Sequence, residues 1–427
     1  MQYPEYIPYK KKNRKGLNIL LLICLIVLLA IGLYQIPRVN RLLSWRIDLA
    51  QTYIHRIFNP VESLPAPMVS RSTAPVAAVP SATPLPATRT PTPLVSPTPT
   101  LVPTPIADKT ILVPPAYDEA KDKQDWNNCG PATLALTLRY FGWEGDQYDI
   151  SKIVKPTRDD RNVNVEELVY YVRNYSGWLK AEFRVGGDID LLKKLLAAGF
   201  PVMIEESFTT DRQYWPEDDL WSGHYLLITG YDDTTRTFTV QDSELGPNQA
   251  VNYEILNSRW QSFNHVYIVV YRAEQEDLLK SILGDNWDVD KNREHALAIS
   301  QQETQNDPQN AFAWFNLGTN LTYFKRYSEA AQAYDTARSI GLPQRMLRYQ
   351  FGPFIAYFQV GRTDDLLTLT KYALDISRTS EEAMLWRGWG FYQNGDKSTA
   401  LNYFRDALKI REDYEDALWA IDYINAN

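Results

Sequence analysis

The sequence predicts three structural parts: a single transmembrane helix, a central α+β domain and an all-α domain of helical repeats. Three patterns support them, namely one long apolar run, alternating apolar strands up to about Tyr271, and a helical period of about 3.6 from there to the end. At 427 residues the chain exceeds what one hydrophobic core serves. The predicted boundaries are 1–16 for a cytoplasmic basic tail, 17–36 for the transmembrane helix, 37–59 for a juxtamembrane amphipathic segment, 60–110 for a linker, 111–273 for the α+β domain and 274–427 for the repeats.

Composition excludes several classes of protein. The formal net charge is -8, and no basic stripe interleaved with aromatic residues lies beyond the N-terminus, so nucleic acid is not an expected partner. Of the 2 cysteines, Cys24 lies within the apolar run, where a disulfide to a water-soluble domain is impracticable. Cys129 is then the only thiol of the soluble part. One such cysteine and no paired histidines at ligand spacing predict neither a metal nor a cofactor.

The N-terminal apolar run extends from Leu17 to Ile36 and is broken only by Asn18. About twenty residues at 1.5 Å each cover the roughly 30 Å hydrocarbon core of a bilayer. The cations before it are Lys10, Lys11, Lys12, Arg14 and Lys15. They predict a single-pass membrane protein with a cytoplasmic N-terminus and extracytoplasmic domains. A cleaved signal peptide is the alternative, although Ala30 and Gly32 form a poor cleavage site. Residues 37–59 suit an interfacial helix or a continuation of the anchor.

Residues 60–110 are rich in Pro, Thr, Ser, Ala and Val. More than half of the 26 prolines lie between Pro60 and Pro115, and the segment has almost no periodic apolar pattern. It cannot bury a core and is predicted to be a disordered, extended tether. At about 3.1 Å per residue it would reach on the order of 150 Å.

Cys129 is predicted to begin a helix. The segment reads Gln124-Asp125-Trp126-Asn127-Asn128-Cys129-Gly130-Pro131-Ala132. Asn127 or Asn128 is a suitable N-cap, and Pro131 fits the first turn, where its missing N–H is not needed. One apolar helical face follows at Leu134, Leu138 and Phe141. The positive end of the helix dipole would stabilise a thiolate at Cys129, whereas an inert buried thiol is the plainer alternative.

His224 is the candidate base. It follows Gly223 at the start of an apolar strand, where a polar side chain is expected to be open to a cleft. The next strand carries Asp242, whose carboxylate is expected to accept the proton of His Nδ1 and fix the tautomer. Gln124 is a candidate oxyanion donor. A structural histidine at 224 and a turn acid at 242 are the alternatives, and Asp232 and Asp233 are assigned to the turn between the strands.

Two further histidines have simpler interpretations. His265 lies in an alternating strand predicted from Phe263 to Val270 and is interpreted as structural. His295 lies on a charged helix and is interpreted as solvated.

The order Cys, His, Asp and its surroundings resemble the bacteriocin-leader-processing cysteine peptidases and their stand-alone relatives, which belong to the papain-like group. The motifs are Asn128-Cys129-Gly130-Pro131-Ala132, Gly199-Phe200-Pro201-Val202, Gly223-His224-Tyr225, Gly230-Tyr231-Asp232-Asp233 and the Asp242 strand. The resemblance covers residues 111–273. It implies a papain-like fold, in which a helix with the nucleophile packs on an antiparallel sheet with the base, and peptide cleavage through an acyl-thioester.

The chain departs from that family at two points. The family's oxyanion glutamine usually lies six residues before the cysteine, where this chain has Lys123, so the role of Gln124 is open. The better-known members are fused to an ATP-driven exporter, but no GxxxxGK[ST] loop is present here. Leader processing is therefore not carried over.

The C-terminal part has the spacing of tetratricopeptide repeats. One unit contains Trp314, Leu317, Gly318, Tyr327, Ala330, Tyr334 and Ala337. Corresponding alanines recur at Ala373 and Ala407, close to the 34-residue period of such repeats. Three units and a helical pair around Leu278–Ala298 suffice for a continuous core. Such repeats usually bind peptides or partner proteins, so substrate capture or assembly is the expected role.

The sequence thus predicts a membrane-anchored, extracytoplasmic cysteine peptidase that acts on a peptide or protein substrate. Its site residues would be Cys129 as nucleophile, His224 as base, Asp242 as orienting acid and Gln124 as oxyanion donor. Two alternatives stay open: a catalytically inactive binding or scaffold protein, and an amidase that acts on cell-wall peptides.

Overall fold

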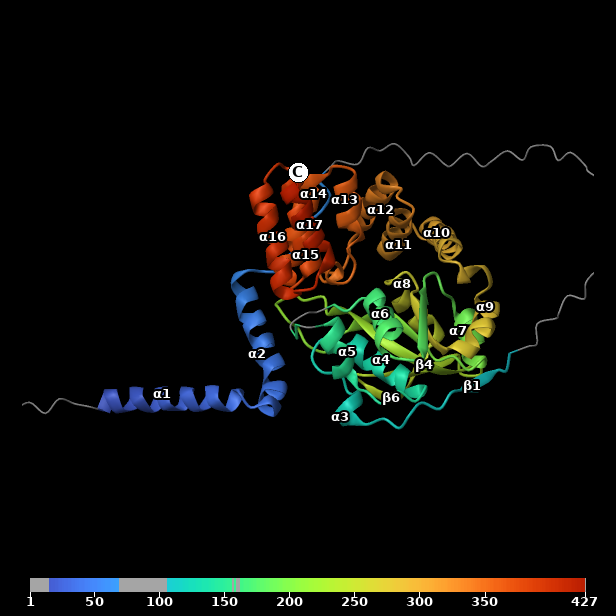
Figure 1. The fold of residues 1–427 in the computed structure, drawn as a ribbon, viewed down its shortest axis with the longest axis horizontal. Helices are drawn as coiled ribbons and strands as arrows, with labels where there is room; N and C mark the ends of the chain where they lie inside the picture. Colours follow the sequence, from blue (N-terminus) through green and yellow to red (C-terminus); the bar gives the residue numbers. More distant parts are fainter. Residues whose placement is uncertain (1–14, 69–105, 156, 159–161, 427) are drawn as a thin grey trace, which may run out of the picture. The chain divides into compact units, whose positions relative to one another are not determined.

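A computed structural model describes residues 15–68, 106–155, 157–158 and 162–426 (Figure 1). Two compact units are found. One comprises the described residues up to Pro60 together with Gln213–Asp218, and the other comprises the remaining residues from Val61 onward. The predicted basic tail and most of the predicted linker, residues 69–105, lie outside the described residues.

The first unit contains two helices, α1 (Lys15–Tyr34) and α2 (Pro37–Phe58). Pro37 occupies the first turn of α2, where its lack of an N–H is tolerated. Residues 37–59 therefore form a helix of their own and not a continuation of the first. Within the described residues, no helix combines the length and the apolar character needed to cross a bilayer. The transmembrane helix predicted for 17–36 is not confirmed.

The central domain is built on one antiparallel sheet with the strand order β2-β7-β3-β4-β5-β6, and β1 pairs with the end of β4. The strands are β1 (Lys109–Ile111), β2 (Leu179–Arg184), β3 (Val202–Thr209), β4 (Trp221–Asp232), β5 (Thr237–Asp242), β6 (Gly246–Asn252) and β7 (Tyr267–Arg272). The predicted combination of an antiparallel sheet with helices is confirmed, and its ordered part begins slightly before the predicted residue 111.

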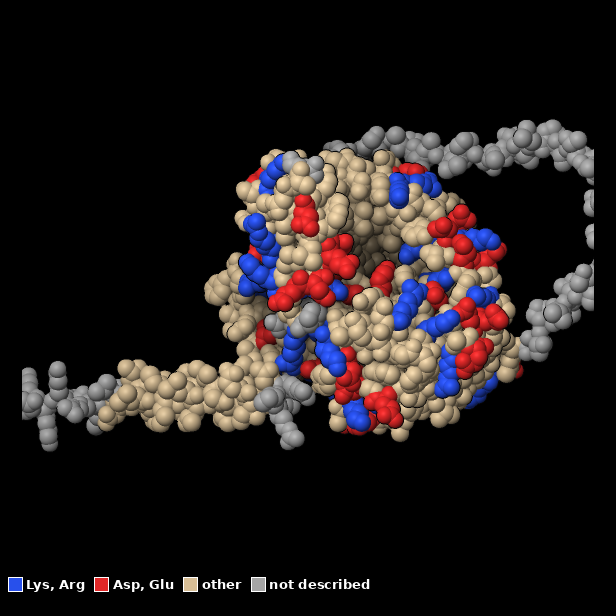
Figure 2. Space-filling view, in the orientation of Figure 1, with Lys and Arg blue, Asp and Glu red and all other residues tan. Residues whose placement is uncertain are grey.

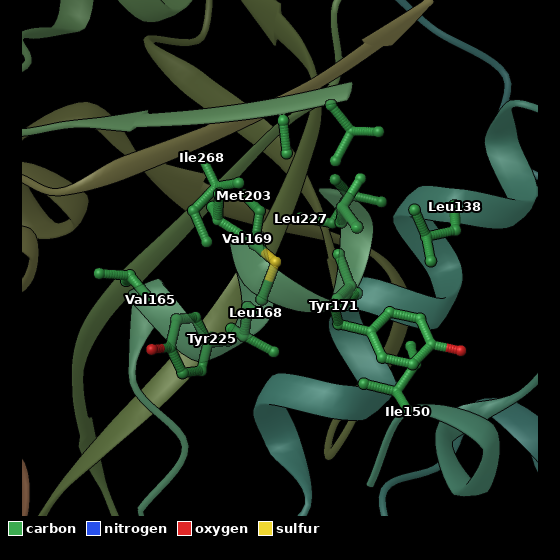
Figure 3. Close-up of a cluster of buried hydrophobic side chains, with 14 of the residues drawn as sticks. Leu138, Ile150, Val165, Leu168, Val169, Tyr171, Met203, Tyr225, Leu227 and Ile268 are labelled. Carbon is green, nitrogen blue, oxygen red and sulfur yellow. The ribbon is translucent and has the colours of Figure 1, made fainter. Parts of the chain in front are cut away.

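Helices lie on both faces of the sheet. They are α3 (Glu119–Asp122), α4 (Cys129–Tyr140), α5 (Gln147–Val154), α6 (Val165–Tyr175), α7 (Ile189–Ala197) and α8 (Tyr253–Gln261). One core contains α4–α6 with side chains such as Leu168, Met203 and Tyr225 (Figure 3). The other contains α7 and α8 with Leu226 and Trp260. Residues 225 and 226 are consecutive in β4 and point to opposite faces, as the pleat requires.

The length of β5 creates the place for α4. Strand β5 pairs with β4 only from Leu226 onward, so the first half of β4 has an edge that no strand covers on that side. The N-terminal part of α4 lies there, because Thr133 Oγ1 donates to the Tyr225 carbonyl at 3.1 Å. The helix that begins at Cys129 is thereby held beside the strand that carries His224.

The C-terminal part consists of helical pairs. They are α11 (Ala311–Tyr323) with α12 (Tyr327–Ile340), α13 (Gly352–Gln359) with α14 (Thr363–Ile376) and α15 (Glu381–Gln393) with α16 (Lys397–Ile410), followed by α17 (Glu415–Ala426). Before them, α9 (Glu276–Leu283) packs on α7 of the central domain and α10 (Val289–Asn306) packs on α11, so the helical pair predicted around Leu278–Ala298 does not form. A Cβ at Gly318 would lie 2.7 Å from the Tyr334 ring, so the glycine allows α11 and α12 to pack closely. The predicted tetratricopeptide-like repeats are confirmed.

The repeats and the central domain belong to the same compact unit. Tyr349, from the loop before α13, lies 2.8 Å through its hydroxyl from Ser222 Oγ, and Asn264 Nδ2 donates to Asn320 Oδ1 at 2.9 Å. Figure 2 shows that the surface is hollowed where the helices α11–α13 face α8. The repeats therefore adjoin the beginning of β4, next to His224.

Residues 61–68 differ from the predicted tether. They form neither helix nor strand and lie against α12 and α14, and Leu64 is only 6% exposed. Backbone groups of this segment bond to Arg338, Asp365 and Tyr372. Composition misled the prediction because a proline-rich segment needs no core of its own when another domain supplies its contacts.

Candidate active site

Cys129 is the first residue of α4 and is partly exposed. Asn128 occupies the N-cap position, but its side chain makes no cap bond and instead donates to Gln147 Oε1 at 2.7 Å. The amide groups of the first turn therefore lack a side-chain cap. The backbone N–H groups of Gly130 and Tyr225 act to lower the pKa of Cys129. Cys129 thus lies where a helix N-terminus and a strand edge supply donors to an anion.

His224 lies between a sulfur and a carboxylate. One ring nitrogen, Nε2, lies 2.9 Å from Asp242 Oδ1, and the hydrogen bonding and charge of His224 lower the pKa of Cys129. The expected Asp242 bond to Nδ1 is wrong, because the ring is turned so that Nε2 faces the acid and Nδ1 is left for the thiol. His224 is also buried, at 3% exposed, and not open to a cleft as expected. The Phe208 ring, 4.9 Å away between centroids, covers it.

Asp242 ends β5 and is held by several donors. Its Oδ1 accepts the N–H groups of Glu244 at 2.7 Å and Leu245 at 3.1 Å, in addition to the histidine. Burial acts to raise its pKa, but these bonds and the charge of His224 outweigh burial and lower the pKa. The acid is therefore ionised at neutral pH. By contrast, Asp232 pairs with Lys109 at 2.8 Å, at the other end of β4.

The protonation states of the pair follow from these contacts. Burial acts to raise the pKa of Cys129, but the bond and charge of His224 and two backbone N–H groups lower it overall. Burial acts to lower the pKa of His224, but Asp242 and Cys129 raise it to about 10. These shifts favour the thiolate of Cys129 and the imidazolium of His224 relative to the free side chains. This pair is a ready nucleophile with a proton donor beside it.

Gln124 lies beside the end of β5. Its N–H donates to the Ser243 carbonyl at 2.8 Å, and Ser243 Oγ donates to its Oε1 at 2.9 Å. The side-chain oxygen is thereby turned toward Ser243, and the Nε2 group has no hydrogen-bond partner among the described residues. Nε2 is thus a donor available to a ligand. Its role as oxyanion donor stays a prediction.

Two buried acids on β3 were not identified from the sequence. Glu206 is the cross-strand partner of His224 and is 2% exposed, and its Oε2 has no hydrogen-bond partner. Burial raises its pKa to about 7, partly opposed by Arg259 and His224. Burial likewise raises the pKa of its neighbour Glu205 well above the usual range. The sequence signal that could have identified them is the presence of two glutamates within the otherwise apolar run that begins at Val202.

The remaining histidines lie apart from this site. His265 is buried in the turn before β7, with φ of 49°, and not within the strand predicted from Phe263. Burial lowers its pKa to about 4, so it is neutral, as a structural histidine would be. His295 is exposed on α10.

Comparisons with solved structures gave these similarities. A candidate C39-like peptidase from Bacillus anthracis is 17% identical, with 38% of this chain and 98% of that chain covered and a TM-score of 0.30. Xylellain, a cysteine protease from Xylella fastidiosa, is 17% identical, with 40% and 87% covered and a TM-score of 0.31. YrrB, a tetratricopeptide repeat protein with an unusual peptide-binding site, is 18% identical, with 34% and 87% covered and a TM-score of 0.19.

A comparison with curated proteins found no match. The sequence model of the Peptidase_C39 like family matches residues 111–271. This range coincides closely with the domain predicted over 111–273 and contains Cys129, His224 and Asp242. The resemblance of this domain to the C39-like cysteine peptidases is therefore confirmed.

Proposed function

We propose that the chain is a cysteine peptidase that hydrolyses peptide bonds at Cys129. The observation that carries the proposal is that one buried imidazole, His224, bonds the Asp242 carboxylate at 2.9 Å and lowers the pKa of the helix-start thiol of Cys129. This arrangement supplies a nucleophile, a proton donor and an orienting acid within hydrogen-bond reach of one another.

The reaction has two halves. The Cys129 thiolate attacks the peptide carbonyl carbon, a C–S bond forms, and the carbonyl oxygen becomes an oxyanion. The His224 imidazolium then gives its proton to the amide nitrogen, the C–N bond breaks, and the amine leaves. Water attacks the resulting thioester while neutral His224 takes its proton, and release of the acid restores the thiolate–imidazolium pair. Asp242 stays ionised and holds the imidazole through Nε2.

The oxyanion requires donors that are fixed before the reaction. Two groups suit this role: the N–H of Cys129, at the helix start where no intrahelical acceptor exists, and Nε2 of Gln124. Ser243 fixes the Gln124 amide by donating to its oxygen, so the donor end is oriented in advance.

The repeats contribute a wall next to the catalytic strand. A Cβ at Gly223 would lie 2.8 Å from the Phe263 ring and 3.0 Å from the Tyr349 ring, so Tyr349 closes over the residue before His224. Substrate approaching from this side would contact the repeats. We therefore include substrate positioning by the repeats in the proposal.

Membrane anchoring and an extracytoplasmic location form a separate part of the proposal. They are supported by the sequence, through the apolar run from Leu17 and the five cations before it. Fractionation of cells with protease added from outside tests this part. Digestion of the peptidase domain in intact cells is expected, and complete protection would contradict it.

The peptidase proposal is tested by cleavage of a peptide library. The assay uses the full chain with the substitution Cys24→Ser, so that Cys129 is the only thiol in the protein. We expect cleavage by this protein and loss of at least about 1,000-fold in kcat/KM after Cys129→Ala. Asp233→Asn is the matched control, because Asp233 lies in the turn at the far end of β4 and pairs with Lys193. No cleavage by the Cys24→Ser protein, or equal cleavage by Cys129→Ala, would contradict the proposal.

A further inference from the structure

The repeats hold a short segment of the same chain, which forms neither helix nor strand, through its backbone groups. The segment Val61–Met68 reads Val-Glu-Ser-Leu-Pro-Ala-Pro-Met and appears in blue beside α14 (Figure 1). Three of its backbone groups are bonded by repeat side chains. The Glu62 carbonyl lies 3.0 Å from Tyr372 Oη, the Pro65 carbonyl accepts from Arg338, and the Met68 N–H donates to Asp365 Oδ1 at 3.1 Å.

Arg338 donates two hydrogen bonds to one carbonyl oxygen. Its Nε and Nη2 both donate to the Pro65 oxygen, at 2.9 and 2.6 Å. The arginine is 4% exposed, so these two N–H groups have little access to water. A buried guanidinium with two parallel donors directed at one point is suited to a fixed acceptor. In this structure the acceptor is a peptide carbonyl.

A charge-balanced network fixes that arginine. Its third group, Nη1, donates to Tyr357 Oη at 2.9 Å and to Asp365 Oδ1 at 3.2 Å. Arg362 bonds Asp365 at 2.7 Å and Asp335 at 2.6 Å, and Tyr357 donates to Asp335 at 2.8 Å. We refer to Arg338, Asp335, Tyr357, Arg362 and Asp365, together with Tyr372, which donates to the Glu62 carbonyl, as the Arg338 clamp. The positive charges of two arginines balance the negative charges of two aspartates. The clamp therefore does not require a charged ligand.

The contacts define what the clamp recognises. They involve backbone groups, which any extended peptide offers, and one buried side chain, Leu64. The prolines at 65 and 67 favour an extended backbone, which reduces the entropy lost on binding. The side chains of Glu62, Ser63 and Ala66 are exposed. The site therefore fits an extended peptide with leucine followed by alternating prolines and is tolerant elsewhere.

We propose that the Arg338 clamp is a binding site for extended Leu-Pro-x-Pro peptides, occupied within the same chain by residues 61–68. The bound segment is a tethered ligand, and a partner peptide of the same chemistry competes with it. This inference does not rest on the proposed peptidase activity, because no clamp residue belongs to the site around Cys129.

The test uses the full chain and a fluorescent peptide with the sequence of residues 61–68. In the wild-type protein the tethered segment competes at high effective concentration, so the peptide should bind weakly. Leu64→Asp removes the buried side chain of the segment without altering the repeats. We expect it to bind the peptide at least about tenfold more tightly than wild type in fluorescence anisotropy. Ser63→Ala, at an exposed neighbouring position, should behave as wild type.

Two further variants assign the binding to the clamp. In the Leu64→Asp background, Arg338→Lys should remove most of the gained affinity, because lysine lacks the fork that grips one carbonyl. Tyr372→Phe should weaken peptide binding while keeping the ring. Equal peptide affinity of wild type and Leu64→Asp would overturn the proposal, and so would unchanged affinity in both clamp variants.

Hydrogen exchange gives an independent readout that needs no added peptide. The Met68 amide should be protected in wild type and in Ser63→Ala and should exchange freely in Leu64→Asp. Fast exchange in wild type would overturn the proposal. Protection that appears only at high protein concentration would assign the segment to a second copy of the chain and would overturn occupancy within one chain.

Discussion

The candidate active site and the Arg338 clamp both bury charged side chains, but they balance these charges differently. In the clamp, two arginines and two aspartates are joined by bonds as short as 2.6 Å, and the remaining arginine donors hold a neutral carbonyl. In the candidate active site, Asp242 bonds His224 at 2.9 Å, and the nearby Glu206 leaves one oxygen without a partner. The clamp is therefore suited to holding a ligand, whereas the candidate active site contains groups that can gain or lose a proton.

The largest effect is expected at the centre of the candidate active site. Asp242→Asn keeps the size of the side chain but removes the charge that favours the imidazolium. We expect kcat/KM for peptide hydrolysis to fall about 100- to 10,000-fold. The pKa of His224, about 10 in the wild type, should also fall. The loss of activity at alkaline pH should therefore begin at a lower pH in the variant than in wild type. A pH–rate profile measures both effects, and a wild-type profile for the variant would contradict the assignment.

Gln124 gives the next largest expected effect. Gln124→Ala removes the Nε2 donor and should lower kcat about 100-fold with little change in KM. Ser243→Ala is the companion variant, because it frees the Gln124 oxygen but keeps the donor, and it should have a smaller effect. If Gln124→Ala retains full kcat, Gln124 only supports the end of β5.

A substitution in the Arg338 clamp should lower the stability of the protein and leave its catalytic activity unchanged. Arg338→Ala leaves Asp365 buried with Arg362 as its remaining cationic partner. We expect the repeats to lose about 2 to 3 kcal/mol of unfolding free energy, because a buried charge loses one of its partners. Hydrolysis of a short peptide should stay within about twofold of wild type. A large loss of hydrolysis in protein that is still folded would mean that the two regions are coupled.

Glu206 gives the smallest effect and the sharpest dependence on pH. Its pKa is raised from 4.5 to about 7 in the folded protein, so the folded state binds the extra proton between these values. This group therefore contributes less stability as pH rises from 4.5 through 7. Glu206→Gln should match wild type at pH 5 and be more stable by about 2 kcal/mol at pH 8.

Urea unfolding at the two pH values measures this difference. Glu274→Gln, at an exposed position in the short turn after β7, is the control and should be as stable as wild type at both pH values. Equal stability of Glu206→Gln and wild type at pH 8 would mean that water or a counter-charge satisfies the carboxylate.

The sequence was most informative where the signals are local. The helix start at Cys129, the strand of His224 and the strand end at Asp242 each have a short motif, and the fold brings the three together. The orientation of the imidazole was predicted wrongly, because it depends on where β5 stops pairing with β4 at Leu226. Register of that kind is a property of the assembled sheet.

The clamp could not be predicted for a different reason. Arg338 and the carbonyl that it holds are 273 residues apart in the chain. Composition assigned residues 61–68 to a tether because they lack a core of their own. Only the assembled repeats show that Leu64 is buried and that three backbone groups of the segment are bonded.

The most direct test of the central claim is the pH dependence of Cys129 alkylation in the Cys24→Ser protein. The pKa of the thiol is lowered by His224 and by two backbone N–H groups, so the thiolate should form at a lower pH than in an ordinary cysteine. Between pH 6 and pH 8 we predict a smaller rise of the rate constant with iodoacetamide than an ordinary thiol shows. A rate that rises about tenfold per pH unit across this range, as for an ordinary thiol with a pKa near 8.5, would contradict the thiolate–imidazolium pair.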